Sequence, residues 1–152
     1  MRHVTGEPTV LRSVGYERFP TPEGLRQALV DAGVERVIDV RDLPQSRRPG
    51  FSRRALEGLL ADAGIVYEHR RELGNPRPIR EIYRSGDVEG GRAAYRAHLL
   101  GERVWALDGL AGILAEQPTA MLCLEDDQAL CHRGIIAEEL VRRHPQVRVE
   151  PL

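Results

Sequence analysis

The chain has 152 residues, of which 41% are apolar, and its formal net charge is −1. This length fits one domain with a normal hydrophobic core, and the apolar fraction excludes a largely disordered chain. No apolar run approaches the length of a membrane span, and residues 1–8 lack the apolar core of a signal peptide. We therefore expect a single cytoplasmic domain over residues 1–152 that has no membrane partner.

Strand and helix patterns alternate along the chain. The motif Thr21-Pro22-Glu23 combines an N-cap, a proline at the first helical position and an acid in the first turn, and Gly33 is typical of a helix end. Ser52 and Gly64 predict the cap and the end of the next helix. The expected strands are residues 10–16, 37–40, 65–69, 119–125 and 147–149, and the expected helices, counted with their caps, are 21–33, 52–64, 89–100, 102–116 and 131–144.

This alternation predicts an α/β fold. The right-handed crossover rule favours a parallel arrangement of strands joined by helices. We expect one three-layer, Rossmann-like domain, with a mostly parallel sheet of about five strands flanked by helices and residues 147–149 as an edge strand. Because residues 71–86 contain Gly74, Pro76 and Pro78, we expect an irregular excursion over the surface there. Ligand sites of such folds lie at the carboxyl ends of the strands.

The basic residues of this chain are all arginine, and many of them are clustered. A general replacement of lysine by arginine explains the isolated arginines. It does not explain why the other arginines form two dense groups. Guanidinium groups suit phosphate and carboxylate, so the arginine-rich loop at residues 41–51 is a candidate anion-binding segment. The first group is Arg41, Arg47, Arg48, Arg53 and Arg54, and the second is Arg70, Arg71, Arg77, Arg80 and Arg84.

Both cysteines lie at one predicted strand-to-helix turn. Cys123 and Glu125 face the same side of the strand, and we expect a nearby arginine to pair with the carboxylate. Cys131 lies at the start of the following helix, where the helix dipole and nearby cationic groups stabilise a thiolate, and His132 can act as a base or a charge partner. The catalytic candidates are therefore Cys131, His132, Glu125 and Cys123. The alternative is that Cys123 is an inert buried thiol and that Cys131 only occupies the N-cap position with a weak S–H donor.

A metal site is a further interpretation of these residues. Cys123, Cys131 and His132 could supply three zinc ligands, with Glu125 or His69 as a fourth. The spacing differs from the usual CxxC pattern, so we expect no metal and no other cofactor. The loop between the two cysteines permits a disulfide, which would be unusual in a reducing cytosol.

Two other strand ends carry polar groups. Asp39 and Arg41 end the second strand, and Tyr67 and His69 alternate along the third. We expect these groups to line the same site, and Asp39 and Arg41 can at the same time form a structural pair that orders the following loop. The substrate-binding candidates are Asp39, Arg41, Ser46, Arg47, Arg48, Tyr67, His69 and Arg133.

Several of these motifs together resemble the DUF488 family. The resemblance implies the fold and a site at the strand ends, but it supplies no reaction. Tyr16 departs from the family pattern, in which a histidine is expected after the glycine. The matching segments are Ser13-Val14-Gly15-Tyr16 with Thr21-Pro22, Asp39-Val40-Arg41, Pro44-x-Ser46-Arg47-Arg48 with Phe51, Tyr67-x-His69 with Leu73-Gly74, and Cys123-x-Glu125 with Cys131-His132-Arg133.

Three functional hypotheses follow. The first is an enzyme that acts on a phosphate-bearing substrate, either a nucleotide or a nucleic acid. The second is a non-catalytic nucleic-acid or nucleotide-binding protein with structural cysteines, although aromatic residues make up only 5% of the chain and leave little for base stacking. The third is a rhodanese-like protein that handles thiols or persulfides, although Cys131 is followed by His132 and Arg133 rather than by a loop of backbone amides.

Overall fold

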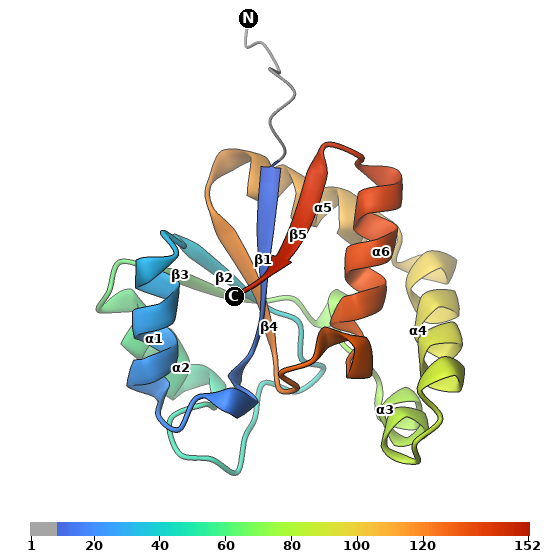
Figure 1. Ribbon diagram of the computed structural model, residues 1–152, viewed down its shortest axis with the longest axis horizontal. Coiled ribbons are helices and arrows are strands. Elements are labelled where there is room, and N and C mark those ends of the chain that lie inside the picture. The colour runs from blue at the N-terminus through green and yellow to red at the C-terminus, as the bar shows by residue number, and fades with distance from the viewer. Residues whose placement is uncertain (1–8) are drawn as a thin grey trace, which may run out of the picture.

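The fold is a single sheet of five parallel strands in the order β3-β2-β4-β1-β5, as seen in a computed structural model that describes residues 9–152 (Figure 1). The predicted parallel sheet and the edge position of β5 are thereby confirmed. The residues on which the expected absence of a signal peptide rests lie outside the described range. The strands are β1 (Thr9–Gly15), β2 (Arg36–Asp39), β3 (Val66–His69), β4 (Thr119–Cys123) and β5 (Val147–Pro151).

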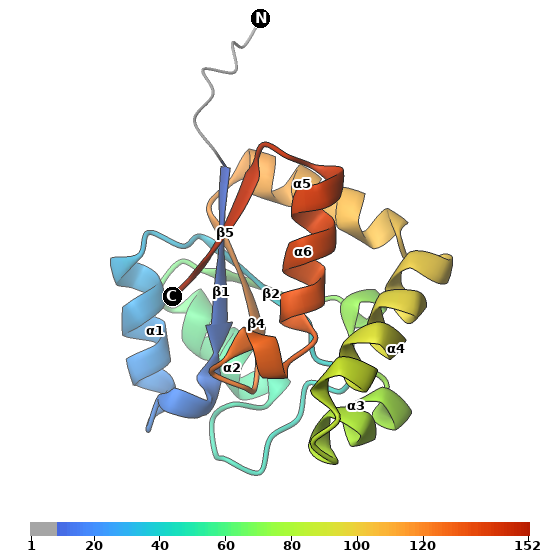
Figure 2. The ribbon, with the colours of Figure 1, turned by 45° about the vertical axis from the view of Figure 1, so that its right-hand side comes forward.

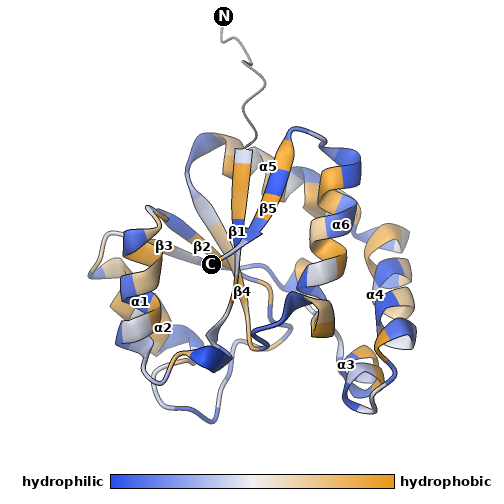
Figure 3. Ribbon diagram, in the orientation of Figure 1, coloured by the Kyte–Doolittle hydropathy of each residue, from blue (hydrophilic) through white to orange (hydrophobic). Residues whose placement is uncertain are grey.

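Helices cover both faces of the sheet and produce the expected three layers (Figures 1 and 2). On one face, α1 (Pro22–Asp31) and α2 (Arg53–Ala61) pack against residues such as Val37 and Leu122. On the other face, α4 (Val88–Glu102), α5 (Trp105–Glu116) and α6 (Arg133–Arg143) bury a separate core. Hydrophobic and hydrophilic residues both occur in β2 and β5, as they do in the helices (Figure 3). Within the described range, no helix has the length and apolar character needed to cross a membrane.

The helix boundaries follow the sequence at all four predicted positions, although Ser52 does not use its side chain as a cap. The Thr21 hydroxyl accepts a hydrogen bond from the Gly24 amide at 3.2 Å. Gly33 and Gly64 adopt φ values of 73° and 76°, which only glycine reaches without strain. Ser52 precedes α2, but its hydroxyl binds the main chain of Ser46 instead of capping the helix.

Three helices differ from expectation. The segment predicted as an irregular excursion contains the helix α3 (Arg77–Arg84). Pro78 is compatible with this helix because it lies in the first turn, where an amide hydrogen would have no hydrogen-bond partner within the helix. Helix α4 continues through Gly101, at which we expected a break, since this glycine stays in a helical conformation. Helix α6 begins at Arg133, so Cys131 precedes the helix rather than starting it.

Candidate functional site

A crevice opens where β1 and β4 end side by side. The chain leaves β1 for α1 on one face and leaves β4 for α6 on the other, which is the switch point at which α/β proteins bind ligands. The two connections touch closely at Gly15: a Cβ atom there would lie 1.8 Å from the carbonyl oxygen of Glu125. The Glu17 amide also donates to the Leu124 carbonyl at 2.9 Å. Glycine is therefore required for the two strand ends to meet.

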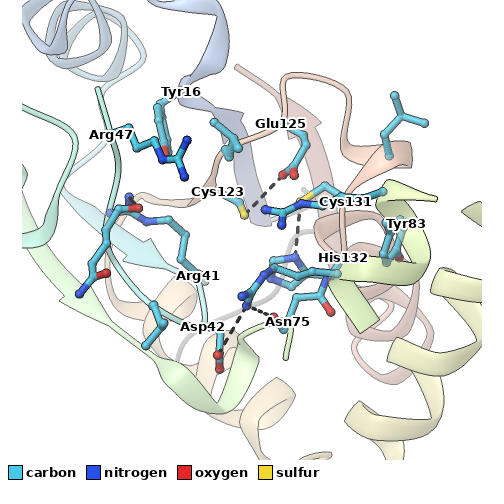
Figure 4. Close-up of a pocket in the computed structure, with 16 residues that line it drawn as sticks. Tyr16, Arg41, Asp42, Arg47, Asn75, Tyr83, Cys123, Glu125, Cys131 and His132 are labelled. Carbon is cyan, nitrogen blue, oxygen red and sulfur yellow. Dashed lines mark hydrogen bonds and ion pairs between the residues drawn. The ribbon is translucent and has the colours of Figure 1, made fainter. Parts of the chain in front are cut away.

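The pocket at this crevice has a volume of about 610 Å³ (Figure 4). It brings together all four catalytic candidates and two of the eight substrate-binding candidates, Arg41 and Arg47. In this view Arg47 and Tyr16 lie on the side opposite His132. The lining residues are Tyr16, Arg41, Asp42, Leu43, Gln45, Arg47, Asn75, Arg80, Tyr83, Arg84, Cys123, Leu124, Glu125, Leu130, Cys131 and His132.

Cys123, Cys131 and His132 form a compact cluster on one wall of this pocket (Figure 4). Their sulfur and ring-nitrogen atoms lie within 4.8 Å of one another. The Nδ1 atom of His132 is 3.5 Å from the Cys131 sulfur, and Nε2 is 2.7 Å from the carbonyl oxygen of Val40. Both cysteines are free thiols, and the chain forms no disulfide between them.

The cluster favours a negatively charged sulfur on Cys131. Burial raises the pKa of this thiol. A hydrogen bond from Cys123 and the nearby positive charge of His132 have a larger, opposite effect, so the pKa of Cys131 lies well below its ordinary value. The hydrogen bond to Cys131, together with burial, raises the pKa of Cys123. Burial lowers the pKa of His132, and the opposing effect of Cys131 raises it overall. Because the two thiols shift in opposite directions, Cys131 is the more acidic of the pair and Cys123 the less acidic.

Glu125 lies beside this cluster without the arginine partner that we expected. Its Oε2 atom is 3.7 Å from the Cys123 sulfur, and no arginine of residues 9–152 pairs with its carboxylate. Arg133 instead donates to the backbone oxygen of Glu125 and, at 2.7 Å, to the Ser13 hydroxyl. Burial, with a contribution from Cys131, raises the pKa of Glu125 to about 7.

Four arginines also line the pocket. The exposed side chains of Arg47 and Arg84 make no ion pair or hydrogen bond with another residue of the described range. Arg80 donates to the Asn75 carbonyl at 2.7 Å and lies 3.6 Å from the Asp42 carboxylate. Two cationic groups therefore face the pocket without a protein anion to neutralise them.

Sequence reasoning missed the contribution of α3 and the turn before it. Asn75, Tyr83 and Arg84 line the pocket, and the Asn75 Oδ1 and Tyr83 hydroxyl atoms are buried without a hydrogen-bond partner in the described residues. Arg80 and Arg84 are four residues apart, a spacing that places them on one helical face. That spacing was the available indication, and the prolines around it concealed the helix.

A known protein family matches most of this chain. Residues 21–140 match the family described as "Domain of unknown function DUF488". The chain belongs to the DUF488 family. No curated protein and no solved structure matches it. In this DUF488 protein, the matched range includes the Cys123–His132 cluster and every arginine of the pocket lining.

Asp39, Arg41, Tyr67 and His69 form a second, interior network of the DUF488 domain. Asp39 is fully buried and accepts hydrogen bonds from the Tyr67 hydroxyl and from two nitrogens of Arg41. Burial lowers the pKa of Arg41, but Asp39 more than compensates and raises it overall. His69 Nε2 donates to the Arg41 carbonyl at 2.7 Å. Of these four residues, only Arg41 lines the pocket.

Ser46 and Arg48 stabilise the arginine-rich loop and do not line the pocket. The Ser46 hydroxyl accepts from the Arg48 amide at 3.1 Å. The Arg48 guanidinium lies 4.4 Å from the centre of the Phe51 ring and donates to the carbonyls of Tyr16, Glu17 and Phe19. These contacts leave Arg47 as the arginine of this loop whose side chain is available to a ligand.

Proposed function

We propose that this DUF488 protein is an enzyme that acts on a phosphate-bearing small molecule, such as a nucleotide, in the strand-end pocket. One observation carries the proposal: a single pocket contains both unpaired arginines and the cluster of Cys123, Cys131, His132 and Glu125. Groups that bind an anion therefore share a pocket with groups that can transfer protons or attack a bond.

The dimensions and polarity of the pocket support a small-molecule substrate. Its volume of about 610 Å³ lies within the range of about 300–1,000 Å³ that is typical of ligand pockets. A concave site of this kind encloses a nucleotide more readily than it follows a duplex. Tyr16 and Tyr83 supply two aromatic rings in the lining, and the unpaired Asn75 oxygen supplies a hydrogen-bond acceptor.

Arg47 and Arg84 are the residues that we assign to phosphate binding. A guanidinium offers several donors in a planar fork that matches the oxygens of a phosphate. Arg41 lines the pocket too, but its guanidinium donates to Asp39 and, at 2.8 Å, to the Phe51 carbonyl. We assign Arg41 to positioning the loop that carries Arg47.

The other predicted binding residues receive positioning roles in the proposal. Asp39, Tyr67 and His69 hold Arg41 in place, and Ser46 and Arg48 shape the loop at residues 41–51. Arg133 holds the connection between β4 and α6, which carries Glu125 and Cys131. Each of these side chains hydrogen-bonds to other groups of the protein. This supports a role in positioning the pocket residues and not in contacting the substrate.

The test is a turnover assay over a panel of nucleoside phosphates and simple phosphate esters, with products identified by mass spectrometry. We expect at least one compound to be converted, conversion to be lost in Cys131→Ser, and conversion to persist in Arg54→Gln, an exposed arginine outside the pocket. Binding of single-stranded or duplex nucleic acid without conversion of any compound would overturn the proposal in favour of a non-catalytic binder. Equal turnover by Cys131→Ser would overturn the assignment of the reaction centre.

A further inference from the structure

We infer that Cys123, Cys131 and His132 bind a zinc ion whose fourth coordination position faces the pocket. All three side chains are buried, with exposed fractions of 7%, 2% and 2%, yet all three contribute to the pocket lining. Thiolate sulfur and imidazole nitrogen are the donors that zinc prefers, and catalytic zinc sites use three protein ligands with one open position.

The distance between the Cys131 and His132 donor atoms is that of a tetrahedral zinc site, and the other two donor distances are compatible with one. Zinc bonds of about 2.3 Å to sulfur and about 2.0 Å to nitrogen separate a sulfur from a nitrogen by about 3.5 Å at a tetrahedral centre. The observed distance from the Cys131 sulfur to Nδ1 of His132 is 3.5 Å. Two sulfurs on the same ion would be about 3.8 Å apart, which agrees with the limit of 4.8 Å that holds for all three donor atoms.

The orientation of His132 provides independent support. The partner of Nε2 is the Val40 carbonyl at 2.7 Å, and because a carbonyl only accepts, Nε2 carries a proton. Nδ1 is then the nitrogen available to a metal, and it is the one that faces the sulfurs. Metal-binding histidines typically donate their second nitrogen to a carbonyl or carboxylate in this way, which fixes the ring orientation.

This assignment reverses the expectation from sequence that no metal is bound. The expectation rested on spacing, since the cysteines are eight positions apart and form no CxxC motif. The ligands instead meet because β4 ends beside the turn that precedes α6. His69, named from sequence as a fourth ligand, is not in the cluster, because its Nε2 atom donates to the Arg41 carbonyl.

Glu125 is the residue that would accept a proton from a water molecule at the open coordination position. Its Oε2 atom lies 3.7 Å from the Cys123 sulfur and within the same pocket. A zinc-bound water is acidified, and an adjacent carboxylate can accept its proton. In the resulting hydrolysis the water oxygen bonds to the electrophilic atom of the substrate, the bond to the leaving group breaks, and Glu125 returns the proton to that group. This use of the ion rests on the proposed function, whereas its binding does not.

The experiment measures metal binding directly. The metal-free full-length chain is titrated with Zn²⁺ against a competing chelator, and with Co²⁺ as a spectroscopic probe. We expect one ion per chain and the visible absorption of tetrahedral cobalt with thiolate ligands. Stoichiometry well below one, or a cobalt spectrum without thiolate bands, would overturn the inference.

Variants identify the ligands. Cys123→Ser, Cys131→Ser and His132→Gln should each weaken zinc binding by more than the 10- to 100-fold that loss of an outer-shell partner costs, while circular dichroism reports whether each chain is folded. If a folded single variant of this set keeps the affinity of the parent chain, the assignment is wrong. Glu125→Gln should retain the zinc, and loss of the ion from this variant would show that the fourth position is closed.

Arg47→Gln separates the two proposals. This variant lacks a phosphate-binding arginine but keeps all three proposed ligands, so we expect full zinc content and weakened phosphate binding. Zinc binding without any effect of Arg47→Gln on a phosphate-bearing ligand would refute the phosphate role and leave the metal site intact. Loss of the zinc in Arg47→Gln would contradict the three-ligand site.

Discussion

The Arg41 guanidinium donates to both carboxylate oxygens of Asp39, with Nε 3.0 Å from Oδ1 and a terminal nitrogen 2.7 Å from Oδ2. Both side chains are almost completely buried, with exposed fractions of 6% and 0%. The same guanidinium donates to the Phe51 carbonyl at 2.8 Å. This pair therefore ties the end of β2 to the far end of the arginine-rich loop and determines where Arg47 lies.

Arg41→Met should destabilise the domain strongly. The substitution leaves the Asp39 carboxylate buried without its cationic partner, and breaking a buried pair in this way typically costs about 3–5 kcal/mol. Urea denaturation followed by circular dichroism measures the change in the free energy of unfolding. Arg54→Met, on the exposed surface of α2, is the control and should change it by less than about 0.5 kcal/mol. Adding Asp39→Asn to Arg41→Met should recover part of the loss, and a further large loss would contradict this account.

Gly15→Ala should separate the ends of β1 and β4. The new methyl group would meet the Glu125 carbonyl at 1.8 Å, which the backbone can relieve only by moving. Overpacking of this kind costs about 1–3 kcal/mol, and we expect the upper part of that range. The free energy of unfolding is the measurement.

Gly58→Ala provides the matched control for this glycine. Gly58 lies inside α2 with no atom within 4 Å of the added carbon. Alanine is favoured over glycine in a helix by about 0.5–1 kcal/mol, so this variant should be more stable than the parent chain. Equal stability of Gly15→Ala and the parent would rule out the close contact between the strand ends.

Arg47→Gln and Arg84→Gln should each weaken the binding of a nucleoside phosphate. A charge-assisted hydrogen bond contributes about 1.5–3 kcal/mol, so we expect a loss of about tenfold or more in affinity for each variant. Isothermal titration calorimetry at constant ionic strength measures the dissociation constants. Arg54→Gln should bind as the parent chain does, and losses of equal size in all three variants would indicate a general charge effect instead of a binding site.

Asp108 should stabilise the fold in a pH-dependent manner. Hydrogen bonds from Arg143 and His144 lower the pKa of Asp108 to about 2. A carboxyl group whose pKa is lower in the folded state stabilises that state fully above its unfolded pKa of about 3.9, and this contribution is lost as the pH falls through the folded pKa of about 2. Asp108→Asn should therefore lower the Tm slightly at pH 5 and by a smaller amount near pH 2. A Tm difference that does not depend on pH would exclude this ion pair as its source.

Local chemistry made much of the fold predictable. Thr21 with Pro22 marks the start of α1, and Gly33 and Gly64 mark helix ends, because caps and left-handed glycines act within a few residues. The same reasoning failed for α3, where prolines suggested a loop. The segment forms a helix because Pro78 falls in its first turn, and its packing against α4 brings Tyr83 and Arg84 to the pocket.

By itself, the sequence determined the succession of strands and helices, the parallel sheet, and the gathering of Cys123, Glu125, Cys131 and His132 at one strand end. Periodicity and capping decide these features locally. Only the tertiary structure decided which of the predicted polar groups face a ligand. Arg41, Arg48 and Arg133 are bound by carboxylate, carbonyl or hydroxyl groups up to 120 positions away in the chain, while Arg47 and Arg84 remain available. No local pattern encodes that difference. Whether a guanidinium bonds to the protein or can bind a ligand depends on the partners that the fold places around it.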